Sequence, residues 1–241
     1  MTVIRKRIID NLQRVRDDIV AAAERVRRDP ADIRLIAVTK AVEIDDIKTL
    51  IDLGVRDLGE NRARQIVERA EVVSDWLARR RKETSEAICW HMIGHLQRNK
   101  VKSVLPVAAM IHSVDTLRLA EEIDRRAAAA GLVGDILLEV NCSGEAQKFG
   151  VPVGAAAHMV DQINTMNNLR IIGLMTMAPL VADAEKARPT FVRLRELFED
   201  MRLEKIGGKD FQHLSMGMSQ DYEVAVEEGA TILRIGTALF E

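Results

Sequence analysis

The segment RLIAVTK (residues 34–40), followed by EIDDIKTLIDLG (43–54), sets the pattern that decides the fold. Within the first segment, LIAV (35–38) is a short apolar run without alternation, which is typical of a strand buried on both faces. The second segment has the period of an amphipathic helix and ends at Gly54, in the position of a C-terminal cap. A buried strand followed directly by a helix is the repeating unit of proteins with a parallel sheet.

The same strand-and-helix unit recurs to the end of the chain. Further short apolar runs are predicted as strands at 55–60, 89–94, 108–114, 135–141, 169–177, 211–216 and 231–236. Helix-period segments lie at 61–81, 115–130, 153–167, 184–204 and 219–228, whereas LQRNKVKSVLP (96–106) leaves room for only a short helix. Eight such units predict an α/β fold, a single (β/α)8 TIM barrel domain over residues 1–241, with an open doubly wound sheet as the alternative. An N-terminal amphipathic helix within residues 1–29, ended by Asp29-Pro30, is expected to pack on the barrel.

Composition narrows the possible partners and the compartment. The chain has 241 residues, of which 47% are hydrophobic, and a formal net charge of −2, so we expect neither nucleic acid nor a membrane as a partner. Cys89 and Cys142 lie in apolar runs, which favours a reducing compartment over a disulfide scaffold or a zinc site. The histidines lack ligand spacing, and we predict no metal. The N-terminus is charged within its first residues and does not resemble a secretory signal, so we predict a cytoplasmic protein.

Residues able to bind an anion follow several of the predicted strands. Barrels of this kind build their sites at the carboxyl ends of the strands, and often bind phosphate after the last two. There the chain has SMGMS (215–219) and RIGT (234–237), whose small residues let backbone N–H groups approach a phosphate. Ser215, Gly236 and Thr237 are therefore candidate phosphate ligands, and Asn61 is a further side-chain donor.

Lys40 ends the first strand at the same mouth. Apolar strand ends around it would partly desolvate the ammonium and lower its pKa, which makes a nucleophilic amine. Such an amine, a phosphate site and the nearby polar aromatic residue His91 together suit pyridoxal phosphate (PLP) held as a Schiff base, and Arg234 points toward the same mouth. Two alternatives stay open: Lys40 as a counter-charge for another phosphorylated metabolite, and His91 as an interior histidine that satisfies backbone carbonyls.

Several motifs along almost the whole chain resemble those of the pyridoxal phosphate homeostasis protein family. They are LIAVTK (35–40), GVRDLGENRAR (54–64), WHMIGHLQRNK (90–100), NCSGEAQKFG (141–150), IIGLMTMAP (171–179), LSMGMSQD (214–221) and RIGTALF (234–240). The resemblance implies the barrel of the alanine racemase N-terminal domain, which is PLP fold type III. The chain departs from the family in AVEI (41–44), where many relatives have a second lysine, and in its final LFE (239–241).

The resemblance also assigns roles to residues. Lys40 would form the covalent aldimine, and Ser215, Gly236 and Thr237 would hold the phosphate, with Met216, Gly217 and Asn61 close by. Arg234 would face the pyridine nitrogen and keep it unprotonated, because a second positive charge beside it is unfavourable. The cofactor would then be a poorer electron sink.

The function implied by the resemblance is to hold and deliver PLP, in vitamin B6 and amino-acid homeostasis, without robust catalysis. Transient contact with PLP-dependent apoenzymes and a monomeric state are expected. The alternative is a PLP-dependent amino-acid racemase, but the sole tyrosine, Tyr222, lies on a predicted helix and offers no obvious second base. Lys148 is either a solvated loop charge or a transient cofactor site.

Overall fold

Eight parallel strands close into a barrel in the computed structural model, which describes residues 3–80, 87–145 and 147–241. The barrel strands are β1 (Arg34–Val38), β2 (Asp57–Glu60), β3 (Cys89–Met92), β4 (Ala108–Val114), β5 (Gly134–Asn141), β7 (Leu169–Met175), β8 (His213–Ser215) and β9 (Ile232–Ile235). Strands that are neighbours in this order pair side by side, and β1 pairs with β9 to close the ring. A two-residue strand, β6 (Val151–Pro152), also pairs with β5. The predicted closed barrel is confirmed over the open sheet.

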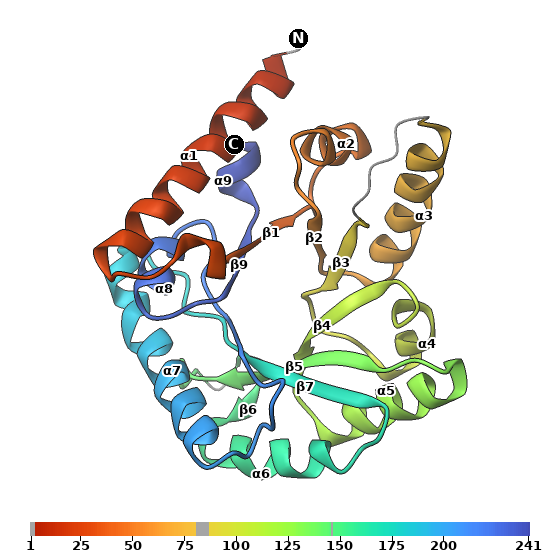
Figure 1. Ribbon diagram of the computed structural model, residues 1–241, viewed down its shortest axis with the longest axis vertical. Coiled ribbons are helices and arrows are strands. Elements are labelled where there is room, and N and C mark those ends of the chain that lie inside the picture. The colour runs from red at the N-terminus through yellow and green to blue at the C-terminus, as the bar shows by residue number, and fades with distance from the viewer. Residues whose placement is uncertain (1–2, 81–86, 146) are drawn as a thin grey trace.

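Helices form an outer ring around these strands (Figure 1). They are α1 (Val3–Arg25), α2 (Ile44–Asp52), α3 (Ala63–Arg79), α4 (Val101–Val104), α5 (Leu117–Ala130), α6 (Val153–Asn164), α7 (Arg188–Leu203), α8 (Tyr222–Glu227) and α9 (Thr237–Phe240). The described residues also form three 3₁₀ turns: η1 (Pro30–Asp32), η2 (Arg98–Lys100) and η3 (Ala184–Ala187). None of the helices in the described ranges is long and apolar enough to cross a membrane.

Most element ends differ from the predicted ones by one to four residues. The short helix predicted between the third and fourth strands is η2 with α4. The segment predicted as one helix over 184–204 begins as η3, and the α-helix starts at Arg188, where Pro189 occupies the first turn. Residues 1–2 of the first predicted helix, and residue 81 of the helix predicted over 61–81, lie outside the described residues.

Two apolar cores explain why the strands are apolar on both faces. The inner core fills the barrel with Ile36, Met110, Leu137, Ile172, Met175 and Ile232. The larger outer core lies between the strands and the helices, and it includes the neighbouring strand positions Ala37, Ile136, Leu138 and Leu233. A strand segment between two such layers, such as Ile36–Ala37 on β1, is apolar on both faces and shows no alternation.

Alternation along each strand then determines which residues reach the barrel mouth. Because Ile36 and Ile232 face inward, Val38 on β1 and Arg234 on β9 face inward one step closer to the carboxyl end. On β5, Leu137 is inward and Glu139 follows it in the same direction. In this eight-strand ring β5 is the fourth strand from β1 in either direction, so Glu139 and the end of β1 lie on opposite walls.

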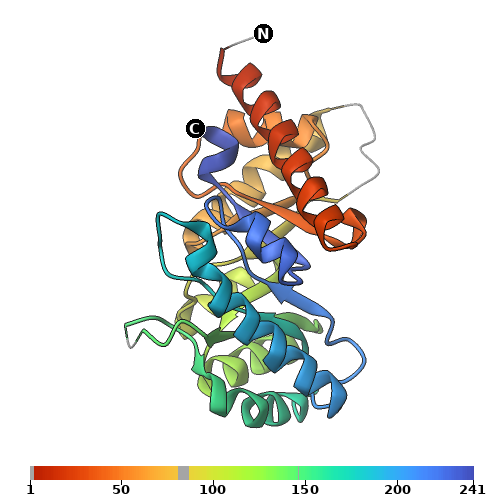
Figure 2. The same cartoon turned by 90° about the vertical axis from the view of Figure 1, so that its left-hand side faces the viewer.

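Helix α1 lies on the outer surface of the barrel, beside the C-terminal helices. It contacts α8, α9 and α2, and Figure 2 shows α9 and α1 side by side. Its buried face is formed by Ile8, Leu12, Val15, Ile19, Ala22 and Ala23. Arg28, just after α1, donates to the carbonyl oxygens of Val226 and Ala230 at 2.6 and 2.8 Å. The amphipathic helix therefore packs on the barrel rather than standing free.

Candidate functional site

A cavity of about 470 Å³ opens at the carboxyl ends of the barrel strands. We call it the mouth cavity, and its lining is Val38, Lys40, Asn61, Ile93, Gly94, His95, Glu139, Phe149, Met177, Pro179, Leu180, Val181, Met218, Ser219, Gln220, Asp221, Arg234, Gly236 and Thr237. Its volume suits a small organic ligand, and its walls combine apolar side chains with a few polar groups.

The structure brings five of the nine predicted site residues to this cavity. These are Lys40, Asn61, Arg234, Gly236 and Thr237. The other four, His91, Ser215, Met216 and Gly217, do not line it. Ser219, Glu139 and Asp221 also line the cavity, and they are not among the residues predicted from the sequence.

Lys40 lies in the turn after β1, and its side chain is exposed. The turn carries the lysine beyond the apolar strand end, where it lines the mouth cavity. The backbone of the turn is held from below by Arg69 on α3. Its guanidinium donates to the carbonyl oxygens of Thr39 and Val42, which flank the lysine. The backbone of the lysine turn is thus held on both sides by hydrogen bonds from α3.

Glu60 completes this support beneath the lysine turn. Its carboxylate is fully buried and accepts from Arg69 and from the Thr39 hydroxyl, each at 2.5 Å. Breaking a buried ion pair by removing one partner leaves an unpaired charge, which is strongly destabilising. Glu60 therefore supports the lysine turn from outside the mouth cavity, to which it does not belong.

Asn61 lines the cavity and carries an acceptor that the protein leaves unused. Its Oδ1 atom is buried, and it has no hydrogen-bond partner among the residues that the structure describes. The residue is held close to the next strand end by Gly94. A Cβ atom on Gly94 would lie 2.3 Å from the Asn61 carbonyl oxygen, so only glycine permits this approach. A buried polar atom without a partner indicates a group that a ligand would satisfy.

Backbone N–H groups converge near the C-terminal end of the chain. The Gly236 and Ala238 N–H groups both donate to the Ser219 hydroxyl oxygen, at 3.2 and 3.1 Å. Ser219 is the second serine of SMGMS, and it lies in the loop after β8, whereas Ser215 is the last residue of that strand. The loop serine rather than the strand serine therefore accompanies Gly236 and Thr237 at the cavity.

Three ionisable groups are buried at the base of the mouth cavity. Burial lowers the pKa of Arg234 to about 10, although the nearby Glu139 and Asp221 carboxylates oppose this change, so the guanidinium stays charged at pH 7. Burial and the Asp115 carboxylate raise the pKa of Glu139 to about 7. Burial also raises the pKa of Asp221, which accepts the Met218 N–H at 2.6 Å. Within the described residues, no three His, Cys, Asp or Glu side chains gather as metal ligands.

The four predicted residues outside the cavity lie in the barrel wall or its interior. Ser215 is fully buried and accepts from Arg234 at 2.5 Å, and His91 is bonded to other side chains. Met216 is buried in the outer core. Gly217 has a φ of +93°, and its carbonyl oxygen accepts the Arg234 N–H at 3.0 Å. Ser215 and Gly217 thus bond to Arg234, and none of the four residues lines the cavity.

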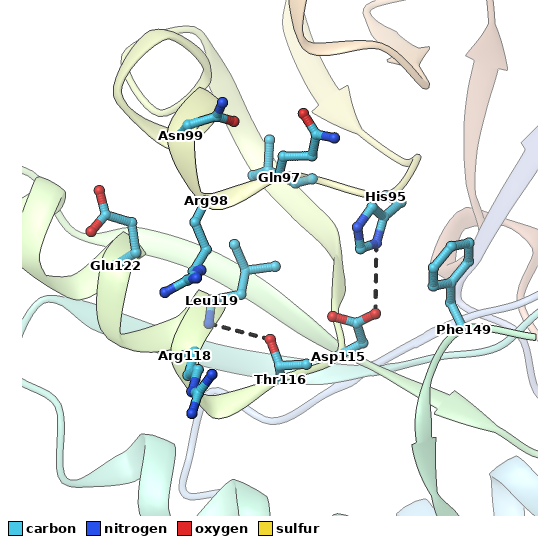
Figure 3. A pocket seen from close by; sticks show the side chains of 11 residues that line it. His95, Gln97, Arg98, Asn99, Asp115, Thr116, Arg118, Leu119, Glu122 and Phe149 are labelled. Atoms are coloured by element: carbon cyan, nitrogen blue, oxygen red, sulfur yellow. Dashed lines mark hydrogen bonds and ion pairs between the residues drawn. The ribbon is translucent and has the colours of Figure 1, made fainter.

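A second, wider pocket of about 880 Å³ lies beside the mouth cavity (Figure 3). The rings of His95 and Phe149 stack with their centroids 4.5 Å apart, and both residues line the two pockets. His95 Nδ1 lies 3.7 Å from Asp115 Oδ2, which Figure 3 marks. Lys148, read from the sequence as either a solvated loop charge or a transient cofactor site, lies in the loop beside Phe149 and pairs with Glu145 at 3.1 Å. It does not line either pocket.

Tyr222 lies away from the mouth cavity, on α8. Its hydroxyl donates to Asp18 on α1 at 2.6 Å, and burial together with that carboxylate raises the pKa of the phenol. Tyr222, the one tyrosine of the sequence, therefore does not line the cavity.

Comparison with known proteins places this barrel and its motifs in a family. Residues 11–241 match the family described as alanine racemase, N-terminal domain. The chain is 38% identical over 231 residues to the pyridoxal phosphate homeostasis protein of Aquifex aeolicus (strain VF5), covering 96% of each chain.

Two solved structures are similar along most of the chain. One is an unknown protein from Bifidobacterium adolescentis, with a TM-score of 0.92, 40% identity, and coverage of 100% of this chain and 97% of that one. The other is PipY of Synechococcus elongatus PCC7942 with PLP bound, with a TM-score of 0.78, 30% identity, and coverage of 92% and 100%. The predicted resemblance is confirmed, and the chain belongs to the alanine racemase N-terminal domain family, among the pyridoxal phosphate homeostasis proteins.

Proposed function

We propose that the chain binds PLP in the mouth cavity and acts in PLP homeostasis, with Lys40 as the amine that forms a Schiff base. The observation that carries the proposal is the meeting of a primary amine, converging backbone N–H groups and a buried guanidinium at one cavity. The buried, unpartnered Oδ1 of Asn61 is a further group that a ligand would satisfy. PipY, which is 30% identical to this chain, was solved with PLP bound.

Each residue has a distinct part in this proposal. When bound, PLP supplies an aldehyde that reacts with a primary amine, and its phosphate supplies a strong acceptor. The backbone around Gly236, with Ser219 and Thr237, would hold the phosphate through N–H and hydroxyl donors. Arg234 would donate to the ring nitrogen in its unprotonated form, because a protonated nitrogen beside a guanidinium is unfavourable. Ser219 replaces Ser215 in this assignment.

We propose carrier activity rather than turnover of amino acids. Relatives that cover nearly the whole chain are named homeostasis proteins. The phenol of Tyr222 is engaged with Asp18 on the outside of the barrel. A guanidinium at the ring nitrogen would also leave the ring a poor electron sink.

One observation favours an amino-acid racemase as a second candidate function. Glu139, whose pKa is raised to about 7, lines the cavity on the wall opposite the end of β1. A carboxyl group that titrates near neutral pH, facing a lysine across a ligand, is a suitable second base. In deuterium oxide, a racemase would exchange the Cα hydrogen of a free amino acid faster than PLP alone, and a carrier would not.

The test of the cofactor assignment compares wild type with Lys40→Ala and Lys148→Ala. Each protein is saturated with PLP, its absorption spectrum is recorded, and borohydride reduction is followed by peptide mapping. We expect a visible Schiff-base band in wild type and Lys148→Ala, reduced onto Lys40, and no such band in Lys40→Ala. Reduction of PLP onto another lysine would show that Lys40 is not the amine that forms the Schiff base. A colourless wild-type protein would favour a different phosphorylated ligand.

We further propose that the protein is a cytoplasmic monomer that contacts PLP-dependent apoenzymes transiently. Phe149 and Leu180, at the edge of the cavity, are large apolar side chains that are 54% and 83% exposed, which suits a brief contact at the point of delivery. The rate at which the PLP-loaded protein activates an apoenzyme should exceed the rate at which PLP that has first dissociated activates it. Equal rates would contradict direct delivery. Light scattering should give the mass of one chain.

A further inference from the structure

A continuous chain of side-chain hydrogen bonds crosses the interior of the barrel. His91 Nε2 lies 2.9 Å from Asp57 Oδ1, and His91 Nδ1 lies 3.1 Å from His112 Nε2. His112 Nδ1 lies 3.0 Å from the Ser215 hydroxyl, which in turn accepts from Arg234 at 2.5 Å. Five residues from β2, β3, β4, β8 and β9 are thus joined without a gap.

This hydrogen-bond chain runs from the partly exposed amino-terminal end of the barrel to the base of the mouth cavity. Asp57 is the first residue of β2, and its side chain is 23% exposed and 3.8 Å from Arg34. The middle of the chain, His91, His112 and Ser215, is buried. Arg234 forms the other end and lines the cavity. A chain of buried polar groups is stable only where every member is satisfied.

The chemistry of the five groups fixes the direction of every bond. Arg234 can only donate, and ionised Asp57 can only accept. His112 is neutral, because burial and the nearby positive charges of Arg234 and Arg34 hold its pKa well below the usual value. Ser215 therefore accepts from Arg234 and donates to His112 Nδ1. His112 Nε2–H then donates to His91 Nδ1, whose own Nε2–H donates to Asp57.

The opposite direction leaves a group unsatisfied. If His91 Nδ1 carried the proton, His112 would accept it at Nε2 and donate from Nδ1 to Ser215. The Ser215 oxygen would then receive two donors, and its own hydrogen would have no acceptor among the described residues. Placing no proton on His91 Nε2 would set two acceptors, that nitrogen and the Asp57 carboxylate, against each other at 2.9 Å.

We propose that Asp57, His91, His112 and Ser215 act as positioning residues, which hold Arg234 as a fixed guanidinium at the base of the mouth cavity. The chain ends in a cation at the cavity and an anion at the far end, so each neutral link is polarised in the same direction. Thr176 takes a second donor of Arg234 through its carbonyl oxygen at 2.9 Å. The remaining N–H groups of Arg234 are left for a ligand.

The consequence for a ligand rests on the proposed function. A guanidinium can only donate, so Arg234 selects a ligand that faces it with an acceptor, and for PLP this would be the unprotonated ring nitrogen. The hydroxyl of Ser215 is used on both sides by the chain. In this proposal Ser215 therefore has no hydrogen left to donate to a phosphate.

The first experiment measures the histidine tautomers in the cofactor-free protein by long-range ¹⁵N–¹H NMR correlation. We expect His91 and His112 both to carry their hydrogen on Nε2. In Ser215→Ala, His112 loses the donor at Nδ1 and should become a mixture of tautomers. His158, which is exposed on α6, is the internal control and should not change. A hydrogen on Nδ1 of either chain histidine in wild type would overturn the proposal.

The second experiment uses the protein loaded with PLP labelled with ¹⁵N in the ring. We expect an unprotonated ring nitrogen in wild type, and in Ser215→Ala a changed nitrogen shift and a roughly tenfold faster loss of PLP, because Arg234 loses a charged hydrogen bond. Asp57→Asn changes the far end, which does not touch the cavity, and should give a smaller change in the same direction. Ser215→Thr keeps the hydroxyl and should restore both readouts.

The outcomes separate this proposal from the proposed function. If PLP does not load onto Lys40 while the tautomers are as expected, the cofactor assignment fails and the positioning chain stands. If PLP loads, but Ser215→Ala and Asp57→Asn leave the ¹⁵N signal of the ring and the rate of PLP release unchanged, then the hydrogen-bond chain does not position Arg234.

Discussion

Glu139 provides a test of the electrostatics of the mouth cavity in the cofactor-free protein. The residue is 3% exposed, and burial with the nearby Asp115 charge raises its pKa from 4.5 to about 7 in the folded protein. Between these two pH values the unfolded chain has lost this proton and the folded protein still holds it. The free energy of unfolding therefore falls as the pH rises through this window. We expect Glu139→Gln to remove that dependence.

The size of the effect follows from proton linkage. With a pKa of 4.5 unfolded and about 7 folded, the Glu139 contribution falls by roughly 2.5 kcal/mol between pH 5 and pH 8. For a chain of this length, that corresponds to about 5–10 °C in Tm. The Tm of Glu139→Gln minus that of wild type should thus rise by about this amount from pH 5 to pH 8.

The measurement is thermal unfolding followed by circular dichroism at four pH values between 5 and 8. Glu121→Gln, an exposed glutamate on α5, is the matched control and should run parallel to wild type at every pH. The titration of Glu139 can be observed directly from its side-chain carboxyl carbon by NMR. Parallel Tm curves for wild type and Glu139→Gln, or an NMR midpoint below pH 5, would refute the reasoning.

Three further substitutions test the surroundings of the cavity. Arg69→Gln leaves Glu60 buried without its ion-pair partner, so the free energy of unfolding measured in urea should fall by about 3–5 kcal/mol. The same substitution should slow PLP loading. Unchanged loading would show that the lysine turn does not need this support. Gly94→Ala should lower both Tm and PLP retention, because the new Cβ atom would collide with the backbone of Asn61. Gly154→Ala is the control and should leave both unchanged, because nothing lies within 4 Å of its Cβ position. Equal behaviour of the two variants would contradict the close approach of Gly94 to Asn61. Tyr222→Phe loses one hydrogen bond, so we expect about 1 kcal/mol of stability to be lost and the spectrum of the loaded protein to be unchanged; a changed spectrum would place the phenol at the ligand.

The order of elements could be predicted well because the barrel buries both faces of each strand. The segment 108–114 coincides with β4, and the run 35–38 falls within β1. Strand ends were less accurate, as for 211–216 against β8 at 213–215. An apolar residue continues a run whether or not its backbone still pairs with the next strand, so the run cannot show where pairing stops.

The cavity lining was only partly predictable from the sequence. Alternation along a strand shows which side chains face the barrel interior, but not how close to the mouth each of them lies. Arg234 and Gly236 both face inward, and the prediction that they share one mouth agrees with the cavity lining. Ser215 also faces inward, but it lies on the last residue of β8, and the following loop carries Ser219 over the mouth instead. Glu139 could have been found, since it follows inward Leu137 on β5 by one alternation.

The interior histidines show what strand register adds to a sequence pattern. His91 was expected either to neighbour a cofactor or to satisfy backbone carbonyls, and in the structure its two nitrogens meet Asp57 and His112 instead. That contact depends on β3 and β4 being aligned so that His91 lies opposite Met110, with an irregularity one residue earlier. A shift of one residue would turn His112 into the outer core, where its ring would have no partner. The register of β3 and β4 therefore also decides whether His112 can bond to Ser215, and through it to Arg234.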